Sequence, residues 1–169
     1  MTQKIILVFG ASGIGKSSLC RTTTRLTTST RVKPPPSGTP MIPENIPSFS
    51  ADHQTERNAS LKMEAILNKI KESKAALCVV DVTPRQLSAW EHLPNKAIEL
   101  GFDSIEIVVL AEEEKIARNR MLNRNPKREE SSIKSALNDQ KRILDKATKN
   151  NWHIGTQAEL ACYIKNICQ

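Results

Sequence analysis

The chain has 169 residues and a net charge of +7, with 25 basic against 18 acidic side chains. This length suits one compact domain with a real core, and no apolar run approaches the ~20 residues of a membrane span. The four cysteines show no C-x-x-C spacing, so we expect reduced thiols in a cytoplasmic protein rather than metal ligands. The positive charge favours anionic partners such as nucleotides or nucleic acid, and the lack of a long apolar run predicts no membrane partner.

A buried strand followed by a glycine-rich turn opens the chain. The apolar stretch Lys4–Phe9 predicts the strand, and residues 10–17 read GASGIGKS. This stretch matches the phosphate-binding pattern G-x-x-x-x-G-K-[ST] at every fixed position. Residues 16 to about 26 predict the helix that follows. Strand, turn and helix start are the context that a phosphate-binding loop (P-loop) requires.

The chemistry of this loop follows from its residue types. Its glycines let successive backbone N–H groups point at phosphate oxygens, and the helix N-terminus adds a partial positive charge. Lys16 is expected to reach the β- and γ-phosphates and the Ser17 hydroxyl to bind Mg²⁺. With no guanine-selecting motif, ATP is the expected nucleotide. The residues expected to contact it here are Gly10, Ala11, Ser12, Gly13, Ile14, Gly15, Lys16, Ser17 and Ser18.

A proline-rich segment follows at about residues 27–47. Its six prolines exclude a regular helix or a central strand, so we expect a long loop insertion. Loops of this length are commonly functional or disordered. A solvated insertion and a loop that faces the substrate remain alternatives.

The rest of the chain alternates strands with helices. The hydrophobic pattern predicts strands at 46–51, 75–82, 104–110 and 152–154, and helices at 56–74, 84–101, 112–125, 129–150 and 156–167. Pro94 is expected to interrupt the helix at 84–101. Capping boxes are expected at Thr83 and Thr156. This alternation predicts an α/β fold. We expect a single P-loop NTPase domain over residues 1–169, with a parallel sheet of about five strands, helices on both faces and an arginine-bearing helical lid.

Two acidic side chains fall where strands are expected to end. Asp81 closes the apolar strand 75–82, as a metal-binding acid of the Walker B type would, and it is expected to bind Mg²⁺ with Ser17. Asp52 follows the strand at 46–51 and is placed to act as a base on an acceptor hydroxyl. For each aspartate, capping of the next turn or helix is the alternative.

The helix at 112–125 carries the arginines Arg118, Arg120 and Arg124. Arg120 and Arg124 are four residues apart and share a face, whereas Arg118 points elsewhere. As a lid over ATP, this helix would use Arg120 to stabilise the transition state, with Arg118 and Arg124 binding the nucleotide. The alternative is a solvated helix in which the acidic residues 112–114 pair with the arginines.

Several motifs together resemble the small P-loop kinases similar to polynucleotide 5′-kinase. They are the P-loop, Ser50-Ala51-Asp52 (similar to S-x-D-D), the block VVDVTPRQLSAW with KAIELGFDSIEIVVL, and Arg118-Asn119-Arg120 (similar to R-N-x-R). The resemblance implies an ATP-dependent phosphotransferase acting on a hydroxyl, with Asp52 as the base that activates a polynucleotide 5′-hydroxyl. It also makes Arg57 a candidate substrate-binding residue.

A second resemblance is to guanylate kinases. Residues 29–38 read STRVKPPPSG and look similar to the substrate loop T-T-R-x-P-R-P-G of that family. This resemblance implies a nucleoside monophosphate kinase with Arg31 holding the acceptor phosphate. A third alternative, from the P-loop alone, is a nucleotide-binding regulatory module without phosphate transfer.

Overall fold

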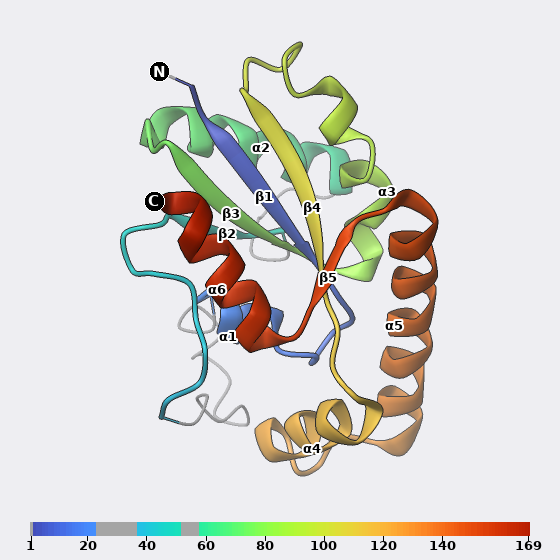
Figure 1. Ribbon diagram of the computed structural model, residues 1–169. Helices are drawn as coiled ribbons and strands as arrows, with labels where there is room; N and C mark the ends of the chain where they lie inside the picture. The colour runs from blue at the N-terminus through green and yellow to red at the C-terminus, as the bar shows by residue number, and fades with distance from the viewer. Residues whose placement is uncertain (1, 23–36, 52–57) are drawn as a thin grey trace.

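The computed structural model describes residues 2–22, 37–51 and 58–169. Their centre is a sheet of five parallel strands in the order β2-β3-β1-β4-β5 (Figure 1). The strands are β1 (Lys4–Phe9), β2 (Ser48–Ser50), β3 (Leu77–Val82), β4 (Ser104–Leu110) and β5 (His153–Gly155). The predicted α/β class and the number of strands are confirmed.

Helices cover both faces of this sheet (Figure 1). They are α1 (Lys16–Leu19), α2 (Ala59–Ser73), α3 (Leu87–Trp90), α4 (Glu114–Arg124), α5 (Glu130–Asn150) and α6 (Gln157–Cys168), with 3₁₀ turns η3 (Pro84–Gln86) and η4 (Leu93–Lys96). Alternate residues of β1 point to opposite faces. Leu7 and Phe9 join the core under α2 and α3, and Ile6 and Val8 join the core under α1 and α6. No helix in the described ranges is long and apolar enough to cross a membrane.

The helix expected at 16–26 is far shorter in the structure. Helix α1 ends at Leu19, and Arg21 adopts a left-handed backbone with φ 58°. An L-residue in that region breaks a right-handed helix. The turn brings the Thr22 amide within 2.8 Å of the Ser17 carbonyl oxygen. The chain therefore turns back toward the P-loop after a single helical turn.

One capping box is confirmed and one is wrong. Thr156 accepts from the Glu159 amide, and the Glu159 side chain accepts from the Thr156 amide. The Thr83 side chain makes no such bond, and the Gln86 side-chain Nε2 instead donates to the Ala51 carbonyl oxygen at 3.0 Å. The helix expected at 84–101, with an interruption at Pro94, is divided into η3, α3 and η4.

The described part of the proline-rich segment, residues 37–47, contains neither helix nor strand. Ile42 and Ile46 are buried, and the Ile42 amide donates to the Leu19 carbonyl oxygen at 3.0 Å. Residues 37–47 therefore pack against α1. Residues 27–36 lie outside the described ranges.

Candidate nucleotide-binding site

The P-loop joins the end of β1 to the start of α1. Gly13 and Gly15 have φ values of 83° and 117°, a region that L-residues other than glycine rarely adopt. Space is restricted as well, because a Cβ atom on Gly13 would lie 2.3 Å from Nη1 of Arg128. The loop thus has the backbone form of a phosphate cradle, with a guanidinium group directly beside it.

Lys16 lies at the centre of this loop with only 5 % of its surface exposed. Its Nζ donates to the Ala11 carbonyl oxygen at 2.9 Å. Burying an ammonium group is costly unless hydrogen bonds compensate it. The lysine charge is therefore held over the loop by the loop's own backbone.

Gln140 is a residue of this site that the sequence patterns did not reveal. Its Oε1 accepts from the Ala11 amide at 2.8 Å, and its Nε2 donates to the Leu110 carbonyl oxygen at 2.6 Å. The side chain is buried, so both ends of its amide are satisfied without water. Gln140 thus connects α5 to the P-loop and to the end of β4. A glutamine inside the apolar stripe of α5 was the available signal.

Asp81 lies near the end of β3, the strand next to β1, and is 1 % exposed. Its position is therefore close to the P-loop. Thr22 Oγ1 donates to Asp81 Oδ2 at 2.5 Å. Arg124 is close enough for the Asp81 charge to raise its pKa, although burial outweighs this effect and lowers the arginine pKa overall. Carboxylate and hydroxyl oxygens are the ligands Mg²⁺ prefers, so Asp81 with Ser17 fits the expected metal. Thr22 is a second residue that the sequence patterns missed.

Arg120 is held beside the P-loop by a carboxylate of the same segment. Its Nη1 lies 2.9 Å from Glu112 Oε1, and the Glu112 side chain is only 7 % exposed. The same oxygen accepts from the Gln157 amide at 3.0 Å. A Cβ atom on Gly15 would lie 3.7 Å from Arg120 Nη1. The ion pair with Glu112 therefore holds Arg120 between the P-loop and the start of α6.

Arg128 extends this row of arginines by another four residues. Its Nη2 lies 3.5 Å from the Ser12 carbonyl oxygen, and its Nε donates to Ser132 Oγ at 3.1 Å. Burial lowers its pKa, although an arginine keeps its charge throughout the physiological range. The residue lies between the end of α4 and the start of α5. Its four-residue spacing from Arg124 is the signal in the sequence that points to it.

Arg118 points to a different partner. Its Nη1 lies 2.6 Å from Glu130 Oε1 and 2.8 Å from Oε2, an exposed pair that raises the pKa of the arginine and lowers that of the glutamate. The structure thus separates Arg118 from Arg120 and Arg124, as their spacing predicts. A contact between Arg118 and the nucleotide stays a prediction, and it requires this pair to open.

The residues expected to handle the acceptor, Arg31, Asp52 and Arg57, lie outside the described ranges. The described neighbours are informative for Asp52. Ser50 is in register with Asp81, and Ala51 follows it directly. Asp52 is the next residue in the sequence and lies outside the described ranges.

The comparisons with known proteins concern the fold. No family model and no curated protein matches the sequence. A shikimate kinase from Bacteroides thetaiotaomicron is 13 % identical, with a TM-score of 0.51, 98 % of this chain covered and 95 % of the other. A gluconokinase from Sinorhizobium meliloti 1021 is 18 % identical, with a TM-score of 0.47 and coverage of 80 % and 74 %. The fold is that of P-loop kinases.

Proposed function

We propose that this protein is an ATP-dependent phosphotransferase that moves the γ-phosphate to a hydroxyl acceptor. The observation that carries the proposal is that three parts of the chain meet at the same edge of the sheet, where the carboxyl ends of β1, β3 and β4 lie. These are the P-loop with Lys16, the buried acid Asp81 on the adjacent strand, and the arginines that follow β4. Phosphoryl transfer depends mainly on positioning and on positive charge around the phosphates, and this edge supplies both.

Each described residue has a definite task in this mechanism. The P-loop amides hold the phosphates, and Lys16 Nζ turns from the Ala11 carbonyl to the transferred group. Asp81 and the Ser17 hydroxyl would hold Mg²⁺, which would supply positive charge to the phosphates. Arg120 and Arg128 lie beside Gly15 and Gly13, where their charges stabilise the transition state.

For the acceptor we propose a polynucleotide 5′-hydroxyl, with Asp52 as the base that takes its proton and Arg57 as a substrate contact. The motif resemblance supports this choice, as does the register of Ser50, two residues before Asp52 in the sequence, with Asp81. The solved structures of similar fold give it no support. A nucleoside monophosphate kinase that uses Arg31 is the alternative acceptor class.

A transfer screen with labelled ATP tests the proposal. The acceptors are 5′-hydroxyl DNA, 5′-hydroxyl RNA, GMP and small sugars. We expect label on a 5′-hydroxyl oligonucleotide, loss of transfer in Asp52→Asn with ATP binding intact, and normal transfer in the exposed control Asp145→Asn. Full transfer in Asp52→Asn contradicts the assigned base. Transfer to GMP that Arg31→Ala abolishes favours the alternative, and slow ATP hydrolysis independent of any acceptor favours a regulatory module.

A further inference from the structure

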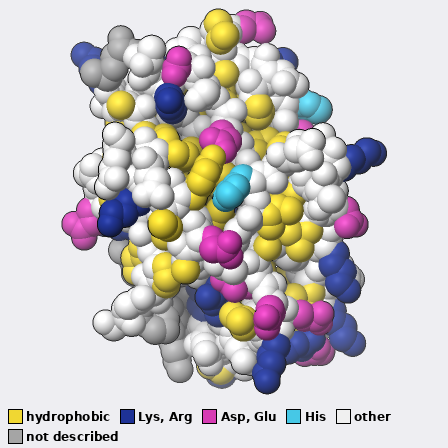
Figure 2. All heavy atoms as spheres, in the orientation of Figure 1, with side chains coloured by type: hydrophobic (Ala, Val, Ile, Leu, Met, Phe, Trp, Pro, Cys, Tyr) yellow, Lys and Arg dark blue, Asp and Glu magenta, His cyan; other side chains and the backbone are white. Residues whose placement is uncertain are grey.

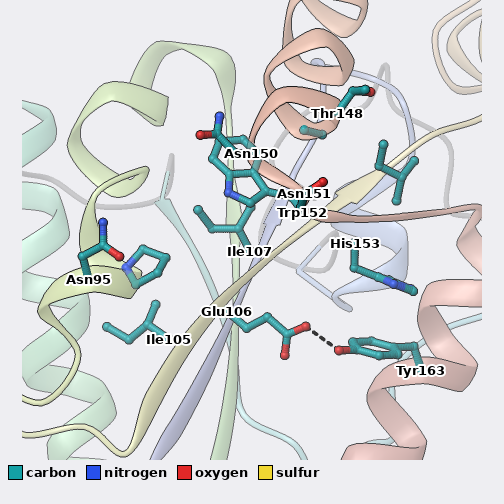
Figure 3. Close-up of a pocket in the computed structure, with 13 residues that line it drawn as sticks. Asn95, Ile105, Glu106, Ile107, Thr148, Asn150, Asn151, Trp152, His153 and Tyr163 are labelled. Atoms are coloured by element: carbon teal, nitrogen blue, oxygen red, sulfur yellow. Dashed lines mark hydrogen bonds between the residues drawn. The ribbon is translucent and has the colours of Figure 1, made fainter.

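A hollow lies beside β4 and β5, on the side of the sheet that is farthest from β2. It has a volume of about 900 Å³ and is lined by residues of η4, β4, the end of α5, β5 and α6 (Figure 3). It exists because β5 is short. Strand β5 pairs with residues 108–110 of β4, which leaves residues 104–107 without a strand neighbour on that side among the described residues. No P-loop residue lines this hollow.

The charge of this pocket differs from that of the protein. The chain carries 25 basic side chains, yet the 13 lining residues include no lysine or arginine and a single carboxylate, that of Glu106. The other polar groups belong to the asparagines and threonine and to Trp152, His153 and Tyr163. Figure 2 shows hydrophobic side chains and a histidine exposed in the middle of this face, while most basic groups lie toward the α4–α5 end. An anionic ligand would find no cation in the lining.

Glu106 is oriented by its neighbours. The Tyr163 hydroxyl donates to Glu106 Oε1, and the two side chains point toward one another (Figure 3). The His153 ring stacks on the Tyr163 ring, with centroids 4.2 Å apart and planes at 17°. This contact with Glu106 raises the pKa of Tyr163 to about 12, because loss of the phenol proton would break the hydrogen bond to the Glu106 carboxylate. A negative charge therefore stands at the edge of an aromatic pair.

Metal binding does not explain this arrangement. Within residues 2–22, 37–51 and 58–169, no three His, Cys, Asp or Glu side chains form a group that could hold a metal ion. One carboxylate beside aromatic rings is instead the combination that binds organic cations, which gain from a charge-assisted hydrogen bond and from the ring face. The volume is in the range of small-molecule pockets, roughly 300–1,000 Å³.

We propose that this pocket binds a small organic cation whose guanidinium or primary ammonium group pairs with Glu106, and whose stem lies along the open edge of β4 at residues 105–107. The side chains of Ile105 and Ile107 belong to the core on the other face of β4, so the stem meets the edge of the strand rather than their side chains. The proposal is independent of the phosphotransferase, because it uses none of its residues.

Agmatine is the probe, and isothermal titration calorimetry on the full chain is the measurement. We expect wild-type protein to bind agmatine and to bind its neutral near-isostere N-butylurea at least about tenfold more weakly, a factor equal to 1.4 kcal/mol. Glu106→Gln should weaken agmatine binding by a similar factor, and Tyr163→Phe by less. Glu72→Gln removes an exposed carboxylate on α2 and should change nothing.

Three results of the binding measurements would overturn the proposal. They are equal affinity for agmatine and N-butylurea, an unchanged affinity in Glu106→Gln, and tighter binding of an Ala-Arg-Ala tripeptide than of agmatine, which would indicate a site for a protein's basic side chain. Circular dichroism and ATP binding report whether each variant is folded. Perturbation of the His153 and Tyr163 ring signals in NMR locates the ligand independently of affinity. Absence of these perturbations during agmatine binding also overturns the proposal.

Discussion

The P-loop site and the Glu106 pocket lie on the same sheet and carry opposite charge. After β1 and β4 the chain places Lys16, Arg120 and Arg128 around a glycine-rich loop. Within β4 it places one glutamate, whose carboxylate accepts a hydrogen bond from a phenol. In both places the charged group is oriented by a neutral partner, the Ala11 carbonyl in one and the Tyr163 hydroxyl in the other.

The difference shows that net charge describes a protein poorly at the scale of a site. A chain of charge +7 attracts anions at long range. Within a few ångströms, ligand choice depends on which side chains line the surface, because desolvated charges act far more strongly than screened ones. Five substitutions test this difference between the P-loop site and the Glu106 pocket. They follow in order from the largest expected effect to the smallest.

Lys16→Ala should nearly abolish phosphate transfer, because it removes the charge at the centre of the cradle. Loss of one such positioned donor costs about 100- to 1,000-fold in kcat. Steady-state ATP turnover measures the effect, and Lys115→Ala, on the exposed surface of α4, is the control. Agmatine binding should be unaffected in both variants; a weakening in Lys16→Ala would show that the two regions are coupled.

Arg128→Ala should lower kcat by about 10- to 100-fold, below the range of a dedicated arginine finger. The reason is its position beside Ser12 and Gly13. The exposed ion pair of Arg118 predicts a smaller loss in Arg118→Ala, since surface pairs are weak. Arg142→Ala on α5 serves as the control. A loss in Arg118→Ala equal to that in Arg128→Ala would mean that the Glu130 pair opens during turnover.

Gln140→Leu should destabilise the fold and loosen the P-loop together. It leaves the buried Ala11 amide and Leu110 carbonyl without their partner, and each unsatisfied buried group costs about 1–3 kcal/mol. Urea unfolding measures the free energy, and the KM for ATP should rise. Asn138→Leu changes an exposed position of the same helix. Equal stability of the two variants would contradict the structural role of Gln140.

Thr22→Val should raise the Mg²⁺ concentration needed for half-maximal activity by about tenfold, the effect of losing roughly 1.4 kcal/mol, because Asp81 loses the hydroxyl that orients it. Thr22→Ser keeps the donor and should restore the wild-type value. The same titration followed by thermal stability with ATP and increasing Mg²⁺ gives a readout without turnover. An unchanged Mg²⁺ requirement in Thr22→Val would contradict the role of Thr22 in orienting Asp81.

The smallest expected effect is a shift in the titration of Tyr163, the one tyrosine of the chain. The Glu106 contact raises its pKa from 10.0 to about 12. The contact therefore stabilises the folded state at pH values below 10.0, and this contribution is lost as the pH rises through about 12. In Glu106→Gln, tyrosinate absorbance should appear at lower pH than in wild type. Coincident titration curves would contradict the contact.

The sequence predicts the sheet well because its strands are short apolar runs with few competing structures. Strand β4 and the ends of α5 match the expected ranges within one residue. The errors occur where a distant partner overrides a local signal. Gln86 has the spacing of a capping box, yet it bonds to Ala51, 35 positions away in the sequence.

The candidate site is predictable only in part for the same reason. The P-loop is a continuous motif, so its residues can be named from the sequence alone. Gln140, Thr22 and Glu112 act through contacts that the fold creates, and no spacing rule connects them with residues 10–17. The pocket around Glu106 depends on the shortness of β5, which is a property of pairing rather than of composition.

Glu112 has a consequence for the entropy of ligand binding. An arginine side chain loses roughly 2 kcal/mol of rotamer freedom when it is ordered. The carboxylate beside Arg120 restricts that freedom while the chain folds, before any nucleotide arrives. A triphosphate that takes the place of this internal counter-ion would then meet an arginine already oriented, and its association would require one less disordered group to be fixed.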